Sequence, residues 1–133
     1  ADGGPWNRIC ALPALWVGLL YDQGALDAAW DLVKGWSIEE QQTLRDAVPS
    51  EGLDAPAPGG GTVGELAHRV LDIAAAGLAA RGEVNSMGDN EVGFLEPLRR
   101  IAASGKSPAH DLMDRYEGPW NHDLSQIYRE LSF

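Results

Sequence analysis

The sequence has little cysteine, few basic residues and no long apolar run, and each shortage excludes a class of protein. Cys10 is the only cysteine in 133 residues, so neither an intrachain disulfide nor a cysteine-ligated metal cluster can form. This usage is typical of a reducing compartment. Ten basic residues against twenty acidic ones give a net charge of −10, which repels phosphate backbones and anionic lipid surfaces. We therefore expect neither nucleic-acid binding nor membrane binding.

The densest apolar segment, residues 9–20, is too short to span a bilayer and contains Pro13 and Gly18. It also lacks the basic leader and the cleavage site of a signal peptide. These features predict a cytoplasmic protein. The hydrophobic content of 44% is ordinary for a globular chain and argues against disorder.

Apolar residues recur at helical spacing through most of the chain. The length of the apolar run at 9–21 and its Leu, Ala and Trp content favour a buried helix. Residues 24–36 carry apolar side chains three and four positions apart, which places them on one helical face. The clearest stripe comprises Val63, Leu66, Val70, Ile73 and Gly77.

Helix caps mark several boundaries. Residues 37–40 and 62–65 both match the capping box, in which a Ser or Thr and a Glu three positions later satisfy each other's backbone N–H groups. The first of these helices is expected to run from about 38 to 47 and to end near Pro49. Gly82 is a good stop for the second. Ser107, followed by a proline, is expected to cap a later helix.

Residues 49–61 hold three prolines and four glycines, a composition that predicts an exposed loop between two helical halves. Residues 83–91 are also loop-like. We find no internal repeat and no convincing strand. The sequence therefore predicts an all-α chain of about six to seven helices, with residues 1–133 forming a single region.

The turn from Asp2 to Trp6 is the best candidate for a functional site. Its two glycines allow a close backbone approach to a ligand, and Trp6 offers a large flat face with one N–H donor. One interpretation is the wall of a small-molecule pocket, and the other is a plain tight turn with a core tryptophan. Arg8 would face either substrate carboxylates or a neighbouring acid.

Other candidate groups favour structural roles. The Gly-rich segment at 59–62 precedes a helix, but no lysine follows it as a P-loop requires, so a linker plus N-cap is preferred. Cys10 lies on an apolar segment and is interpreted as a buried, inert thiol. His68 and Asp72 are expected to form a surface pair. The spacing of His110 and the acids after it spreads them round a helix, so no metal site and no catalytic residue is predicted.

The opening sequence carries the most specific motifs. An Ala-Asp-Gly-Gly-Pro-Trp turn at 1–6 leads into Cys-Ala-Leu-Pro-Ala-Leu-Trp-Val-Gly-Leu-Leu-Tyr-Asp at 10–22. This arrangement resembles the start of the C-terminal region of plant and proteobacterial-type glutamate–cysteine ligases. Looser counterparts extend the resemblance along essentially the whole chain: residues 26–33, 44–49, 94–98, 107–109 and 116–120, and the aromatic C-terminus at Phe133. The departures, at 59–61 and 85–90, fall in expected surface loops.

The resemblance implies an ATP-dependent ligase that joins the γ-carboxylate of glutamate to the amine of cysteine with the help of Mg²⁺, the first step of glutathione synthesis. It also implies that this chain is the C-terminal portion of an α+β enzyme, with the antiparallel catalytic sheet encoded upstream and absent here. The chain alone would then be inactive, with its helices supporting the sheet. Trp6, Arg8 and Asp2 would form one wall of the substrate pocket.

The alternative is a free-standing, acidic helical interaction module without catalysis. A portion of a larger fold should expose the apolar face that the missing part covers, and such a face could also support a homo-oligomer. A module should be a monomer without such a face. Any disulfide partner of Cys10 would lie in sequence outside this chain or in another chain, so redox regulation is not predicted here.

Overall fold

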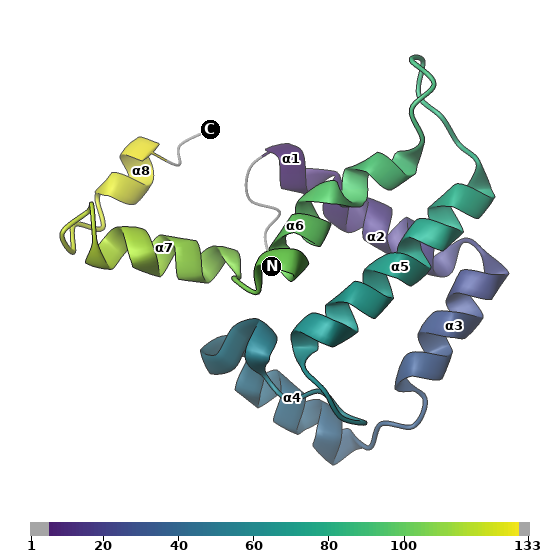
Figure 1. The fold of residues 1–133 in the computed structure, drawn as a ribbon, viewed down its shortest axis with the longest axis horizontal. Helices are drawn as coiled ribbons and strands as arrows, with labels where there is room; N and C mark the ends of the chain where they lie inside the picture. Colours follow the sequence, from purple (N-terminus) through teal and green to yellow (C-terminus); the bar gives the residue numbers. More distant parts are fainter. Residues whose placement is uncertain (1–5, 131–133) are drawn as a thin grey trace.

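The computed structural model describes residues 6–130, with side chains from Arg8 onward, and this part of the chain is helical (Figure 1). Its α-helices are α1 (Trp6–Ile9), α2 (Ala11–Leu20), α3 (Gln23–Val33), α4 (Ile38–Glu51), α5 (Val63–Arg81), α6 (Glu96–Ser104), α7 (Pro108–Glu117) and α8 (Gln126–Glu130). Two 3₁₀ turns, η1 (Gly52–Asp54) and η2 (Glu91–Leu95), precede α5 and α6 respectively. Residues 6–130 contain only isolated β-bridges and no strand. The all-α prediction is confirmed.

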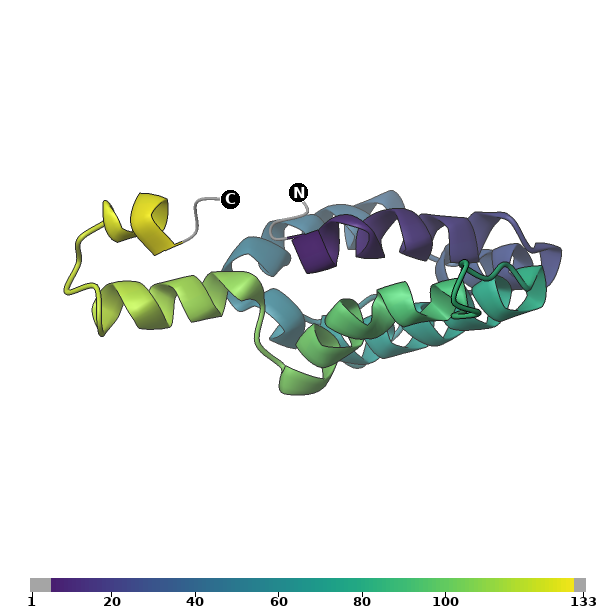
Figure 2. The same ribbon diagram turned by 90° about the horizontal axis from the view of Figure 1, so that it is seen from above.

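Helices α2 and α5 form the centre of the fold, and α6 and η2 pack beside them. Figure 2 shows the arrangement from above, with α1 and α2 in one layer and α5 and α6 in the other. The buried side chains between the layers are small or aliphatic. They comprise Ala14, Leu19, Leu71, Ala74, Leu78, Leu95 and Ala102.

The backbones of α2 and α5 approach each other through two glycines. A methyl group built on Gly18 would lie 2.9 Å from Cα of Ala74 and would also collide with the Ala74 carbonyl. A methyl group on Gly77 would collide with the Gly18 carbonyl and lie 2.9 Å from Cβ of Ala25. Only glycine permits this contact, and it brings α3 close to α5 as well.

The helix caps form as the sequence indicates. Both capping boxes are present, with Ser37 and Glu40 at the start of α4 and Thr62 and Glu65 at the start of α5. Gly82 adopts the left-handed conformation at the end of α5, with φ +69°. Local signals therefore set these helix ends correctly.

The predicted end of α4 was wrong by one turn, since the helix continues through Pro49 to Glu51. The N–H of Gly52 donates to the carbonyl of Val48, so the helical ladder resumes beyond the proline. Pro49 removes one backbone donor in an exposed last turn, where that loss is least costly. The loop expected at 49–61 is accordingly shorter, and its first part is helix followed by η1.

Burial also differs from expectation in two places. The helix predicted over 9–21 is present as α2, with Ile9 ending α1 before it, but much of its outer side is exposed and not buried as expected. In α5 only Gly77 of the expected stripe is fully buried, together with Leu71, Ala74 and Leu78. The other members of that stripe are half-buried. Because α5 contacts α2, α3 and α6 around its circumference, burial is not confined to one narrow face.

Helices α7 and α8 form an arm (residues 108–130) that extends away from the other helices (Figures 1 and 2). The arm has its own internal contacts. Trp120 is 4% exposed, and its ring centre lies 6.0 Å from the guanidinium of Arg115. Hydrogen bonds from Ser125 lower the pKa of Asp123 in the turn before α8. No helix within residues 6–130 combines the length and apolar content needed to cross a membrane.

The α2–α5 contact predicts the effect of a single methyl group. We expect Gly77→Ala to lower the free energy of unfolding by about 1–3 kcal/mol, because overpacking outweighs the roughly 1 kcal/mol that alanine gains in helix propensity. Urea-induced unfolding followed by circular dichroism measures the difference. Gly93→Ala is the matched control, since nothing lies within 4 Å of its new methyl group. Equal stability of the two variants would contradict the interpretation.

Candidate functional site

The predicted site residues lie at the N-terminal end of the described chain. Trp6 and Arg8 fall within α1, which contacts α2 and α6. The side chain of Arg8 is half-buried. Asp2 and the side chain of Trp6 lie outside the described part. The structure therefore shows the helix that carries Trp6 and Arg8, and their contact with substrate stays a prediction.

Helix α2 begins immediately after this turn and has two different apolar faces. The helix buries Ala11, Ala14, Gly18 and Leu19, and three of these four residues are small. The large side chains Leu12, Trp16 and Leu20 recur four positions apart on another face, and all three are exposed. We call these three residues the α2 stripe. The exposed fraction of Trp16, the largest of the three, is 54%.

A second apolar stripe lies on α3. Its predicted apolar face is present, but Leu26, Trp30 and Val33 are exposed, with Trp30 at 63%. The side chain that α3 buries is Ala25, which packs against Gly77 of α5. Small residues thus make the contacts with α5, and the larger ones remain uncovered in the described chain.

Cys10 is exposed at the junction of α1 and α2, so the expectation of a buried thiol was wrong. The apolar neighbours in sequence point to burial only if the whole segment is one covered helix. The break between Ile9 and Ala11 places Cys10 at the N-cap of α2 instead.

The Gly-rich segment is a linker and a cap, as expected. Gly59, Gly60 and Gly61 all have positive φ. The carboxylate of Glu65 accepts a hydrogen bond from the N–H of Thr62 at 3.1 Å, so a negative charge already occupies the N-terminus of α5. An incoming phosphate would meet this charge and the helix end would offer it one fewer donor.

One surface ion pair differs from the sequence interpretation, and two further contacts were not predicted. Asp72 pairs with Arg99 of α6 at 2.8 Å, and not with His68 as expected. At the end of α5, Nε of Arg81 lies 3.2 Å from Oε2 of Glu91. The guanidinium of Arg81 also lies 5.8 Å from the ring centre of Tyr21. Spacing along one helix could not reveal these partners, because each lies on a different element.

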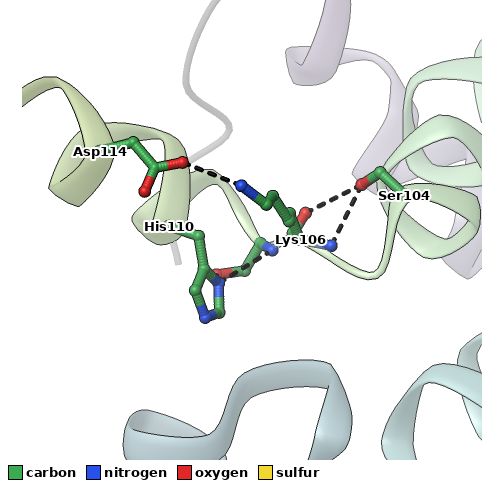
Figure 3. Close-up of polar contacts among 5 residues, drawn as sticks. Ser104, Lys106, His110 and Asp114 are labelled. Atoms are coloured by element: carbon green, nitrogen blue, oxygen red, sulfur yellow. Dashed lines mark hydrogen bonds and ion pairs between the residues drawn. The ribbon is translucent and has the colours of Figure 1, made fainter.

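The junction between α6 and α7 holds a polar cluster that the sequence interpretation did not assign (Figure 3). Nζ of Lys106 lies 2.9 Å from Oδ2 of Asp114, and this hydrogen bond raises the pKa of Lys106. The N–H of Ser107 donates to Nδ1 of His110 at 3.2 Å. Ser107 was predicted as a cap, but the role of His110 was missed. The signal was its position three residues after Ser107, where a capping box carries its second member.

No larger ligand set gathers in the described part. Among these residues no three His, Cys, Asp or Glu side chains are placed to hold a metal ion together. A shallow hollow of about 240 Å³ lies between α4 and the segment before α5. It is lined by Glu39, Glu40, Thr43, Leu44, Pro56, Ala57 and Pro58.

Comparison with known proteins gives a consistent result. Residues 1–130 match the model of glutamate-cysteine ligase family 2 (GCS2). The chain is 41% identical over its 133 residues to glutamate–cysteine ligase A, chloroplastic, of Oryza sativa subsp. indica, covering 26% of that protein. Glutamate–cysteine ligases, chloroplastic, of Brassica juncea and Arabidopsis thaliana are each 41% identical to it, over 24% of their lengths. The chain thus spans about a quarter of the length of the curated relatives it matches.

The occupied N-terminus of α5 gives a testable difference between a cap and a phosphate site. Thr62→Ala should lower the free energy of unfolding by about 1 kcal/mol, since it removes the hydroxyl that accepts from the N–H of Glu65. Thr62→Ser keeps that hydroxyl and should retain most of the stability. Urea unfolding measured at two concentrations of inorganic phosphate that differ tenfold completes the test. Stabilisation by phosphate that disappears in Thr62→Ala would contradict the capping interpretation.

Proposed function

Because the chain belongs to glutamate–cysteine ligase family 2, we propose that it is the C-terminal portion of a glutamate–cysteine ligase acting in glutathione synthesis. In this proposal the complete enzyme joins the γ-carboxylate of glutamate to the amine of cysteine. ATP would supply the phosphoryl group that activates the γ-carboxylate, Mg²⁺ would neutralise the phosphate oxygens, and the cysteine amine would then displace the phosphate. The helices described above support the upstream catalytic part and do not carry the reaction themselves.

The observation that carries this proposal is the α2 stripe. A helix that is apolar all round is normally buried on every side. Helix α2 is covered by α5 on the face of its small residues, while Leu12, Trp16 and Leu20 remain open to solvent. Large exposed apolar surfaces mark positions where another part of a protein packs. We assign this position to the upstream catalytic sheet.

The chemistry of the reaction supports the same division. Phosphoryl transfer needs a divalent cation and basic groups that neutralise the phosphate oxygens. Within the described residues the acids and histidines do not gather into a metal-binding group. Arg81, Arg99, Lys106 and Arg115 are each paired with an acid. We therefore place the metal ligands and the phosphate clamp in the upstream part.

The N-terminal turn is the part of this chain that we propose to face the substrates. Helix α1 places Trp6 and Arg8 directly before α2, at the same end of the molecule. In this proposal Trp6 forms a flat wall against the amino-acid substrate, Arg8 binds a substrate carboxylate and Asp2 lies beside the substrate amine. The proposed compartment is the cytoplasm, whereas the names of the relatives above place those proteins in chloroplasts.

The alternative, a free-standing interaction module, predicts a monomer whose apolar residues are covered. The exposed stripes on α2 and α3 do not favour it. They do allow two copies of the chain to associate through these faces when the upstream part is absent.

The proposal that the 133-residue chain is inactive without the upstream part is tested by measuring ADP release that depends on ATP, glutamate and cysteine. The 133-residue chain should give no release above background, while the full-length product of the gene should turn over under the same conditions. Turnover by the 133-residue chain at a rate comparable to the full-length protein would refute the proposal. Circular dichroism of the same sample checks that the chain is folded.

The role of Arg8 is tested in the full-length protein. Arg8→Ala should raise KM for glutamate or cysteine by about tenfold or more, the factor expected when a hydrogen-bonded charge pair worth 1.5–3 kcal/mol is lost. Arg8→Lys should restore part of the loss because it keeps the charge. Arg45→Ala, at an exposed position of α4, is the control. An unchanged KM for both substrates in Arg8→Ala would remove Arg8 from the site.

A further inference from the structure

The body of the molecule, residues 6–104, makes few contacts with the arm. Residues 105–107 link α6 to α7, and Figures 1 and 2 show α7 leaving the other helices at that point. Among the described residues, neither α7 nor α8 packs extensively against a helix of the body. One contact is made by His110, since a methyl group built on Gly52 would lie 3.0 Å from its Cε1. The body therefore contributes little to the stability of the arm.

The arm is also too small to be stable by itself. Helix α7 has 10 residues and α8 has 5, whereas helices shorter than about 12–15 residues are marginal in water. The core of the arm forms around Trp120, whose Nε1 is buried without a hydrogen-bond partner among the described residues, at a cost in stability. Units of fewer than about 40 residues usually need disulfides, a metal or association with another protein surface. The arm has no cysteine and, in the part that the structure describes, no group placed to hold a metal ion, so association remains.

The large apolar side chains of the arm are available for such an association. Within residues 108–130, Trp120 is buried, while Leu112 and Met113 of α7 are exposed. Leu124, before α8, and Tyr128, within it, are exposed as well, Tyr128 at 81%. Several exposed apolar side chains on one small unit mark a position where another protein surface packs.

Charge and chain length distinguish the partners that could cover these side chains. The arm carries five acids and two basic residues, a net charge of −3, and the whole chain carries −10. A second copy of the chain would bring more negative charge to the contact and be repelled. The relatives are about four times as long as this chain, so in the proposed enzyme the upstream part offers the larger surface. These observations favour the upstream part over a second copy.

We propose that the arm docks on the upstream part of the same polypeptide, against an apolar surface flanked by lysine or arginine residues. The inference rests on the proposed function, in which this chain is the C-terminal portion of a longer enzyme. Met113, Leu124 and Tyr128 contact the apolar surface. Glu117, at the exposed end of α7, faces the basic residues beside it.

Hydrogen–deuterium exchange with mass spectrometry compares the 133-residue chain with the full-length protein at one pD. Protection of peptides from α7 should be about 100-fold greater in the full-length protein. Docking covers several large apolar side chains, and each one shifts the opening equilibrium roughly tenfold or more. Equal protection in the two proteins would overturn the proposal. Protection in the full-length protein that rises with its concentration would also overturn it, because the arm would then bind a second copy.

The two methionines of the chain provide a matched pair of variants. Met113→Gln keeps a similar helix propensity and should lower the protection of α7 about tenfold in the full-length protein. In the 133-residue chain, where Met113 is exposed, it should change little. Met87→Gln, at an exposed position between α5 and η2, should leave the protection of α7 unchanged in both proteins. An equal loss from Met113→Gln in both proteins would show that Met113 acts within the arm, against the proposal.

The charge of the partner is tested by Glu117→Lys. A cation in the last turn of α7 stabilises the helix locally, so protection in the 133-residue chain should stay the same or rise. In the full-length protein it should fall about fivefold, because the new charge meets the basic residues of the upstream part. A rise in both proteins would overturn the proposed charge of the partner. None of these readouts needs ligase activity, so a protected arm in a full-length protein without turnover would refute the proposed function alone.

Discussion

The close approach of the α2 and α5 backbones determines where the other helices can pack. Gly18 and Gly77 leave no room for a side chain between the two helices, and the next residues along the contact are alanines. With the two axes held this close, Ala25 of α3 reaches Gly77 as well. Leu78 and Leu95, both fully buried, then fill the space beside the contact. Packing at this density makes even one added methyl group costly.

The parts of the fold that local chemistry determines could be predicted from the sequence. The capping boxes at Ser37 and Thr62 and the left-handed Gly82 depend only on residues within one turn, and all appear where expected. The continuation of α4 through Pro49 could not be read locally, because the cost of a missing donor depends on whether that turn is buried. His110 as a cap was readable from its spacing, but a rule restricted to glutamate and glutamine overlooks it.

Burial was harder to predict, because it depends on which elements meet. The large side chains of α2 are recognisable in the sequence, yet Leu12, Trp16 and Leu20 are exposed while Ala11, Ala14, Gly18 and Leu19 are buried. The same holds for α3, where Ala25 is buried and Trp30 is exposed. A hydrophobicity pattern ranks the larger residues first and therefore overlooks Ala25 as the residue that α3 buries. The candidate site was hard to predict for a related reason. The periodicity of the sequence does not say which elements would come together around a substrate at Trp6 and Arg8.

The exposure of large apolar side chains on α2 has a consequence for how this region folds. Burial of apolar surface contributes about 25 cal/mol per Å², and three of the four residues that α2 buries (Ala11, Ala14 and Gly18) are too small to bury much of it. In the proposed full-length enzyme, a second layer over Leu12, Trp16 and Leu20 would add to the free energy that α2 contributes. The cooperative folding unit of that enzyme would then be larger than these helices. A substitution in the covering layer would be felt as local unfolding of α2, far from the altered residue, and the first turn that carries Arg8 would loosen with it.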